Sequence, residues 1–139
     1  MKHQHRITEI MTADVRTVHL GQSLGDVWEI IRDGGLHHVP VVDGAMPVGM
    51  VSSTDLLKLV YNFEGTDERM LKTLLDHQFT LEESMSSSLE TMMVSGTVRH
   101  AADRMADGDL HSLVVLNEDG TLAGIVTSTD LIRFLRDHL

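Results

Sequence analysis

The chain has no cysteine among its 139 residues, which excludes disulfide bonds and thiolate zinc sites. Aromatic residues make up only 4%, so a core has to be built mainly from Val, Leu, Ile and the nine Met. No apolar run approaches the roughly 20 residues needed to cross a bilayer, and the polar start lacks the pattern of a signal peptide. These absences predict a soluble, cytoplasmic chain with no direct membrane insertion.

Basic residues are also scarce. The chain has 11 Lys and Arg against 21 Asp and Glu, which gives a formal net charge of −10. Such a balance argues against binding to the phosphate backbone of a nucleic acid. Salt screens the overall field beyond roughly 10 Å, so a local site can still bind a small anion.

What the sequence does contain is an internal repeat. A shift of 74 positions places Met11 on Met85. After one inserted residue, Gly49–Leu56 (GMVSSTDL) matches Gly124–Leu131 (GIVTSTDL). Turn and cap residues match as well as apolar residues, which shared composition would not produce. The sequence therefore predicts two copies of one structural unit.

Each repeat has the pattern β-α-β-β-α, with strands expected at 15–18, 37–42 and 48–51, and at 89–94, 111–116 and 122–127. Caps for the helices are predicted at Ser23, Ser53, Thr97 and Ser128. Between the repeats, Thr66 can cap a helix over 67–77 that is too apolar for a flexible linker. The predicted organisation is a first repeat over 7–63, a helical connector over 64–80 and a second repeat over 81–139.

One motif occurs intact in both repeats: glycine, two apolar residues, Ser or Thr, two further residues and Asp. The copies are Gly49–Asp55 and Gly124–Asp130. The motif brings a strand to a helix N-terminus, where free N–H groups and the helix dipole favour a phosphate. Ser52 and Thr127 add a hydroxyl, and the carboxylates of Asp55 and Asp130 can accept both hydroxyls of a ribose. Simple helix capping, without any ligand, is the competing interpretation.

With these motifs, both repeats resemble CBS domains over nearly the whole chain apart from the connector and the extreme N-terminus. The resemblance implies an α/β fold in which two β-α-β-β-α repeats pack through their sheets with pseudo-two-fold symmetry. It also implies clefts between the repeats that bind AMP, ADP, ATP, S-adenosylmethionine, NAD or a related adenosyl ligand. The expected function is regulatory: a homodimeric, non-catalytic module that requires no cofactor and signals ligand binding to a partner protein.

The resemblance also assigns site residues. The ribose and phosphate side comprises Ser52, Thr54, Asp55, Thr127, Thr129 and Asp130. The base slot comprises Thr12, Val18, Leu36, His38, Val39, Pro40, Met92, Leu110, Ser112 and Leu113, with Ser86 nearby. A second family motif, glycine to proline, is complete only at Gly35–Pro40; its counterpart Asp109–Val114 lacks both end residues. Several family members carry a basic residue where this chain has His38 and Ser112. Phosphate contacts are therefore assigned to His37, His38 and His111, whose charge depends on pH.

Other functions find less support in the sequence. Nine histidines suggest a metal site, but adjacent His37 and His38 point to opposite faces of a strand, and His3 and His5 lie near the chain start, so no metal site is predicted. No nucleophile elbow or dinucleotide fingerprint is present. The remaining alternative is a dimerisation or scaffold module with vestigial clefts. Trp28, Met92, Met93 and the Met70–Leu75 stripe could supply its surfaces, although core burial is the favoured interpretation of each.

Overall fold

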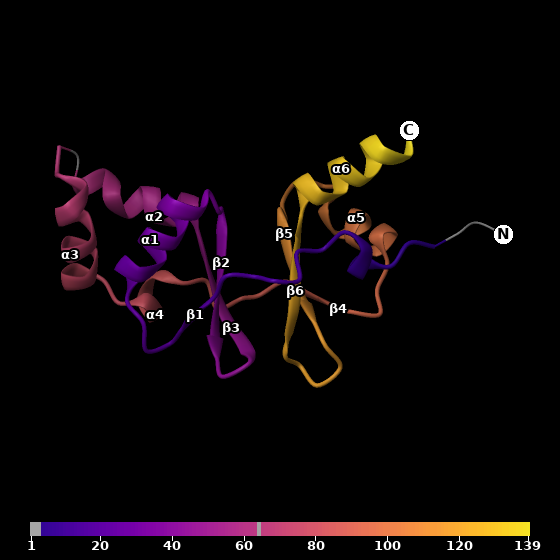
Figure 1. Ribbon diagram of the computed structural model, residues 1–139, viewed down its shortest axis with the longest axis horizontal. Helices are drawn as coiled ribbons and strands as arrows, with labels where there is room; N and C mark the ends of the chain where they lie inside the picture. Colours follow the sequence, from indigo (N-terminus) through magenta and orange to yellow (C-terminus); the bar gives the residue numbers. More distant parts are fainter. Residues whose placement is uncertain (1–3, 64) are drawn as a thin grey trace. The chain divides into compact units, whose positions relative to one another are not determined.

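The computed structural model describes residues 4–63 and 65–139, which form two compact units (Figure 1). The central unit is Arg16–Ser88. The terminal unit joins the N-terminal residues up to Val15 with Leu89–Leu139. In the described part of the chain, no helix is both long and apolar enough to cross a bilayer.

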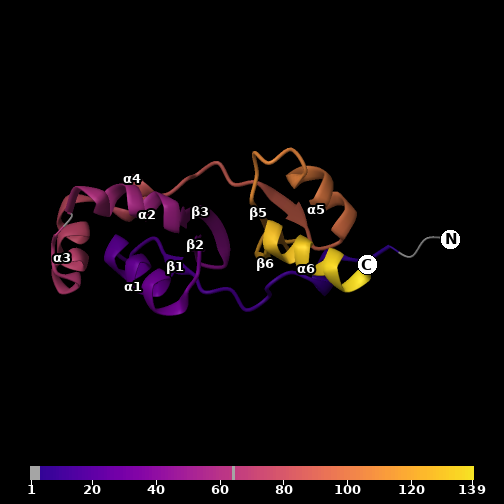
Figure 2. The same cartoon turned by 90° about the horizontal axis from the view of Figure 1, so that it is seen from above.

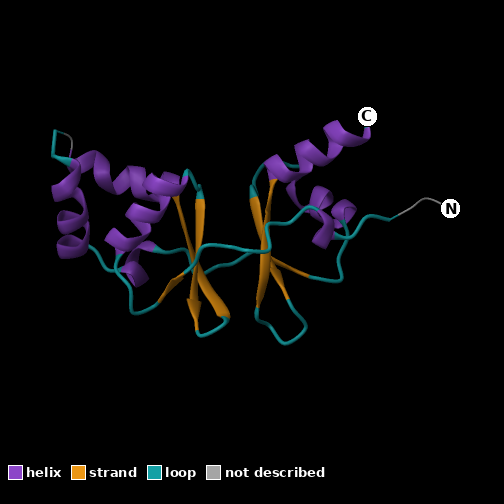
Figure 3. Ribbon diagram, in the orientation of Figure 1, coloured by secondary structure: helices purple, strands orange, loops and turns teal. Residues whose placement is uncertain are grey.

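Each unit contains one three-stranded sheet in which the first strand runs parallel and the third antiparallel to the middle strand. The central unit consists of β1 (Val18–His19), α1 (Leu24–Gly34), β2 (His38–Asp43), β3 (Met46–Ser52), α2 (Ser53–Val60), η2 (Tyr61–Phe63), α3 (Glu68–Gln78) and α4 (Leu81–Ser84). The terminal unit consists of η1 (Ile7–Glu9), β4 (Thr91–Met93), α5 (Val98–Met105), β5 (Ser112–Leu116), β6 (Leu122–Thr127) and α6 (Ser128–His138). The predicted β-α-β-β-α order is confirmed in both units, and the longer helices of each unit lie on one face of its sheet (Figure 3).

The two cores consist of aliphatic residues and methionine, as the shortage of aromatics predicts. The central core contains Val18, Leu24, Val27, Val39, Val41, Val51, Leu56, Leu75 and Leu81. The terminal core contains Ile7, Met92, Ala101, Met105, Leu113, Val115 and Val126. Ile7 is fully buried, so the N-terminal segment is an integral part of the terminal unit.

The helix caps are partly as predicted. Ser23 and Thr97 cap α1 and α5, and their hydroxyls accept hydrogen bonds from the N–H groups of Asp26 and His100. The predicted caps Ser53, Ser128 and Thr66 are wrong by one residue: the caps are Ser52, Thr127 and Asp67. Ser52 and Thr127 end their strands with extended backbone angles, so the last strand residue is also the cap. The first strand is also displaced from its predicted position and pairs with Val41 and Val42.

Helix α3 packs directly on α1 in the central unit (Figure 2). Leu75 on α3 is fully buried in the core of the unit. The Asp76 carboxylate accepts a 2.7 Å hydrogen bond from the Gly25 N–H, and Lys72 lies 3.1 Å from Glu29. A Cβ at position 25 would lie 2.5 Å from Lys72 Cγ, so the glycine permits this close approach.

Candidate functional site

In the central unit, the repeated motif forms the turn from β3 into α2. The Ser52 N–H donates to Asp55 Oδ2 at 3.1 Å, and the Asp55 N–H donates to Ser52 Oγ at 3.1 Å. The next N–H, that of Ser53, donates to the His37 carbonyl at 2.8 Å. The motif serine and aspartate therefore close a reciprocal capping box.

In the terminal unit, the turn from β6 into α6 repeats this arrangement. Asp130 Oδ2 accepts from the Thr127 N–H at 2.9 Å and from the Thr127 hydroxyl at 3.3 Å. The Ser128 N–H donates to the His111 carbonyl at 3.1 Å. The two turns thus share the bond from the cap N–H to the aspartate Oδ2 and the bond to the histidine carbonyl. They differ at the cap hydroxyl, which accepts from the Asp55 N–H in Ser52 but donates to Asp130 in Thr127.

Capping engages only one oxygen of each motif carboxylate. Within residues 4–63 and 65–139, no hydrogen bond engages Oδ1 of Asp55 or of Asp130. Both aspartates are half-buried, and the bonds to Oδ2 fix the side-chain rotamer. Capping and ligand binding are therefore compatible, since the cap holds the second oxygen in a defined direction.

Strand register places other predicted site residues beside these turns. His38 on β2 pairs with Ser52 on β3, and Ser112 on β5 pairs with Thr127 on β6. The half-buried Leu36 and Leu110 precede β2 and β5 by two residues each. In each unit, the structure thus brings a base-slot position next to a ribose-side position.

Other predicted site residues are divided between core and surface. Val18, Val39, Pro40, Met92 and Leu113 are buried, so a ligand would reach them mainly through backbone groups or through the shape they give the sheet. Exposed residues include Thr54 and Thr129, in the first turns of α2 and α6, together with Thr12, His37 and His111. Their roles in binding stay predictions.

The motif glycines leave room for two segments that pair with the edge strands, one at Thr12 and the other at Ser86. Thr12 exchanges two backbone hydrogen bonds with Ile125, at 2.9 and 3.0 Å, along the free edge of β6. Ser86 does the same with Met50 on β3. A Cβ at Gly124 would lie 2.6 Å from the Thr12 carbonyl oxygen, and one at Gly49 would overlap the side chain of Met85. The glycine of the motif therefore has a packing role that the sequence interpretation missed.

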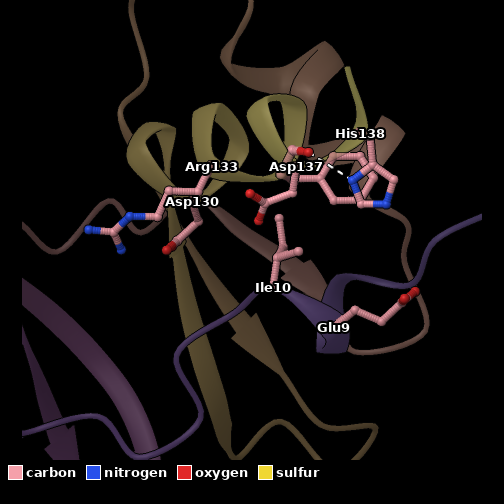
Figure 4. A pocket seen from close by; sticks show the side chains of 7 residues that line it. Glu9, Ile10, Asp130, Arg133, Asp137 and His138 are labelled. Atoms are coloured by element: carbon pink, nitrogen blue, oxygen red, sulfur yellow. Dashed lines mark hydrogen bonds between the residues drawn. The ribbon is translucent and has the colours of Figure 1, made fainter.

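A pocket of about 350 Å³ lies beside α6 in the terminal unit (Figure 4). It is lined by Glu9, Ile10, Asp130, Arg133, Phe134, Asp137 and His138. Asp130 is the motif aspartate, whereas Arg133 was not among the predicted site residues. A signal for Arg133 was present in the sequence, because both repeats carry a basic residue three positions after the motif aspartate: Lys58 and Arg133.

Two of the three pocket carboxylates lie beside a histidine or arginine side chain. Glu9 accepts a 2.7 Å hydrogen bond from the Arg6 N–H and lies 3.2 Å from His5 Nδ1. Asp137 forms an ion pair with Arg136 at 3.0 Å. Asp130 uses only Oδ2, so Asp130 and Arg133 are the charged groups of this pocket most available to a ligand.

In the part of the chain that the structure describes, the histidines do not form a metal-binding cluster with other side chains. Within the described residues, no group of three or more His, Asp or Glu side chains could hold a metal ion. His37 Nδ1 lies 3.4 Å from the Ser53 hydroxyl, beside the capped turn. His3 lies outside the described residues.

The repeated sheet, turn and motif define a tandem-repeat class of α/β protein, and comparison with known families identifies it. The CBS domain family model matches residues 7–62 and 81–137. The chain belongs to the CBS domain family and carries two copies of the domain.

Curated relatives are similar over almost the whole chain but are longer proteins. An uncharacterized protein of Methanocaldococcus jannaschii is 29% identical over 95% of this chain, which covers 32% of that protein. A homoserine O-acetyltransferase of Methanohalobium evestigatum is 26% identical over 94% of this chain, which covers 24% of the enzyme. The chain thus spans about a quarter to a third of the length of these two relatives.

Solved structures of CBS pairs share the fold. The CBS domain pair of protein MJ0100, in complex with 5′-methylthioadenosine and S-adenosyl-L-methionine, is 23% identical with a TM-score of 0.78, and the match covers 99% of this chain and 100% of that one. The protein CBSX2 in complex with AMP is 24% identical with a TM-score of 0.77, and the match covers 96% and 98% of the two chains. CBSX2 is a CBS-pair protein from Arabidopsis thaliana.

Proposed function

We propose that this chain is a regulatory module that binds an adenosyl ligand and transmits its occupancy to a partner protein. The ligand class comprises AMP, ADP, ATP, S-adenosylmethionine and NAD. The module requires no cofactor, works in the cytoplasm and catalyses no reaction. Ligand binding acts by favouring one conformation or assembly state over another, which the partner distinguishes.

The observation that carries this proposal is the repeated, pre-oriented carboxylate at a strand-to-helix turn. Asp55 and Asp130 each hold Oδ1 beside the first turn of a helix, while Oδ2 is fixed by the cap. A carboxylate oxygen is a strong acceptor for the hydroxyls of a ribose. The same arrangement in both repeats favours a ligand site over capping alone.

Relatives support the ligand class. The two structural neighbours were crystallised with AMP, and with S-adenosyl-L-methionine and 5′-methylthioadenosine, all of which carry an adenosyl group. The similarity to homoserine O-acetyltransferase covers only 24% of that enzyme.

Self-association is the second part of the proposal. A groove of about 590 Å³ runs between α5 and α6 in the terminal unit, and its apolar lining includes Val98, Ala102, Leu131, Ile132 and Leu135. Ile132 and Leu135 are 64% and 56% exposed. Burial of such side chains against a second copy of the chain would remove apolar surface from water. The alternative function, a scaffold with vestigial clefts, uses the same groove without any ligand.

The test of ligand binding is thermal unfolding of the purified chain with AMP, ATP, S-adenosylmethionine and NAD, each in large excess. A ligand that binds only the native state raises the melting temperature. Asp55→Ala and Asp130→Ala should each reduce the shift. Asp26→Ala is the matched control, because Asp26 closes an equivalent capping box on α1 away from both motif turns. No shift with any of the four compounds would leave the scaffold function.

A further inference from the structure

A basic residue follows the motif aspartate by three positions in both repeats. In the terminal unit the pair is Asp130 and Arg133 on α6, and in the central unit it is Asp55 and Lys58 on α2. Side chains three residues apart on a helix are neighbours, with about 5–6 Å between their Cβ atoms. Figure 4 shows Asp130 and Arg133 side by side at the end of α6 nearest the motif turn.

Both basic side chains are available for a ligand. Arg133 and Lys58 are exposed, and no ion pair engages either of them among residues 4–63 and 65–139. Several other cations are paired, such as Lys72 with Glu29 at 3.1 Å and Arg104 with Glu90 at 2.7 Å. Arg136, which lies near Arg133 on α6, pairs with Asp137 at 3.0 Å.

The pocket around Arg133 would otherwise repel an anion. Glu9, Asp130 and Asp137 line it, and the whole chain carries a formal charge of −10. Asp137 pairs with Arg136, and Glu9 is engaged by the Arg6 N–H and His5, so Asp130 and Arg133 are the charged groups nearest the first turns of α6. A ligand that places a neutral hydroxyl on the aspartate and an anionic group on the arginine would satisfy both.

We infer that Arg133, and Lys58 in the other repeat, bind a phosphate of the ligand whose ribose contacts the neighbouring aspartate. This inference rests on the proposed function and narrows it to nucleotides that carry a 5′-phosphate, in preference to an uncharged adenosine or thioether. The proposed phosphate ligands are therefore Arg133 and Lys58, in place of the histidines proposed from the sequence. Arg133 can bind phosphate in a bidentate manner, whereas Lys58 acts as a point charge.

The experiment is calorimetric titration of the full chain with AMP and, separately, with adenosine. Wild-type protein should bind AMP more tightly than adenosine. Arg133→Gln should weaken AMP binding at its site by about tenfold, the magnitude typical of one charge-assisted hydrogen bond, and change adenosine affinity by less than about twofold. Arg133→Lys should keep part of the preference for AMP. Arg136→Gln is the matched control, because it removes a paired arginine from the same helix, and it should leave both affinities unchanged.

The possible outcomes separate this inference from the proposed function. Equal affinity of the wild type for AMP and adenosine, or an equal loss of both in Arg133→Gln, would overturn the phosphate role and leave adenosyl binding intact. Unchanged AMP binding in both Arg133→Gln and Lys58→Gln would also overturn the phosphate role. If wild-type protein binds neither compound, the proposed function fails and this inference fails with it. Far-ultraviolet circular dichroism of each variant confirms that α6 is intact.

Discussion

The central and terminal units share one β-α-β-β-α plan but differ in what covers their helices. In the central unit, α3 packs on α1 and inserts Leu75 into the core. In the terminal unit, the groove between α5 and α6 is open to solvent and lined by apolar side chains. Gly25 of the first repeat corresponds to Arg99 of the second, and Arg99 lines that groove.

This difference shows that two repeats with the same fold can differ in the helix that packs on them. The missing side chain at Gly25 lets the α3 backbone and side chains approach α1, with Lys72 and Asp76 within contact distance. The equivalent position on α5 carries Arg99, whose side chain lines the groove. In the central unit α3 covers α1, whereas the terminal unit leaves an apolar groove between α5 and α6.

The largest expected effect is on the stability of the central unit, in which α3 covers α1. Leu75→Ala should lower the free energy of unfolding by about 3 kcal/mol, because it removes a fully buried side chain and leaves a cavity. Urea unfolding followed by circular dichroism measures the change. Met70→Ala is the control, since Met70 lies on the same helix but is 50% exposed, and it should change stability little. A small effect of Leu75→Ala would show that α3 is not needed to complete the central core.

The motif glycines should differ in their tolerance of a methyl group. At Gly124 a Cβ would meet the Thr12 carbonyl oxygen, which is backbone, whereas at Gly49 it would meet only the flexible side chain of Met85. Gly124→Ala should therefore cost about 2 kcal/mol and Gly49→Ala less than about 1 kcal/mol. Thermal unfolding of the two variants in parallel shows which of them loses more stability. A larger loss at Gly49 would contradict the packing of the segment that contains Thr12.

Self-association should depend on the open groove more than on the covered unit. Ile132→Asp should weaken dimer formation by at least about tenfold, because a charge would replace an apolar side chain in the interface. Leu57→Asp is the matched variant, since Leu57 is the repeat equivalent of Ile132 and is 61% exposed. Sedimentation equilibrium measures both constants. A loss confined to Leu57→Asp would place the interface on the central unit instead.

The smallest expected effect concerns the caps of α1 and α5. The hydrogen bond from the Ser23 backbone lowers the pKa of Asp26, with further help from the Ser23 hydroxyl and Lys72 against the opposing effect of burial. Because the folded pKa lies below the ordinary value of 3.8, this carboxylate stabilises the fold at neutral pH, and the contribution is lost as pH falls through the folded pKa. The equivalent position on α5 is His100, which provides no carboxylate for a capping box.

Asp26→Asn should therefore destabilise the protein slightly at pH 7, and the difference from wild type should shrink below pH 3.8. Urea midpoints across this pH range measure it. Asp103→Asn, on the exposed face of α5, serves as the control. A difference that grows on acidification would have the wrong sign for a carboxylate with a lowered pKa.

Much of the fold was predictable from the repeat itself. Apolar periodicity and the paired motifs predicted two β-α-β-β-α units, because they are local signals that occur twice. The caps at Ser52 and Thr127 were misplaced by one residue, since Ser52-Ser53 and Thr127-Ser128 each offer two adjacent hydroxyls and only the strand end decides between them. The exposure of Arg133 beside Asp130 and the packing at Gly124 depend on tertiary contacts, so sequence periodicity did not reveal them.

The most direct test of ligand binding at the repeated turns is a crystal structure of the protein grown with AMP. We predict AMP beside the first turn of α6, with a ribose hydroxyl within hydrogen-bond distance of Asp130 Oδ1 and the phosphate on Arg133. The same arrangement is expected at Asp55 and Lys58 if both repeats are occupied. Well-ordered protein without AMP at either turn, under conditions in which calorimetry detects binding, would show that the repeated aspartates serve only as helix caps.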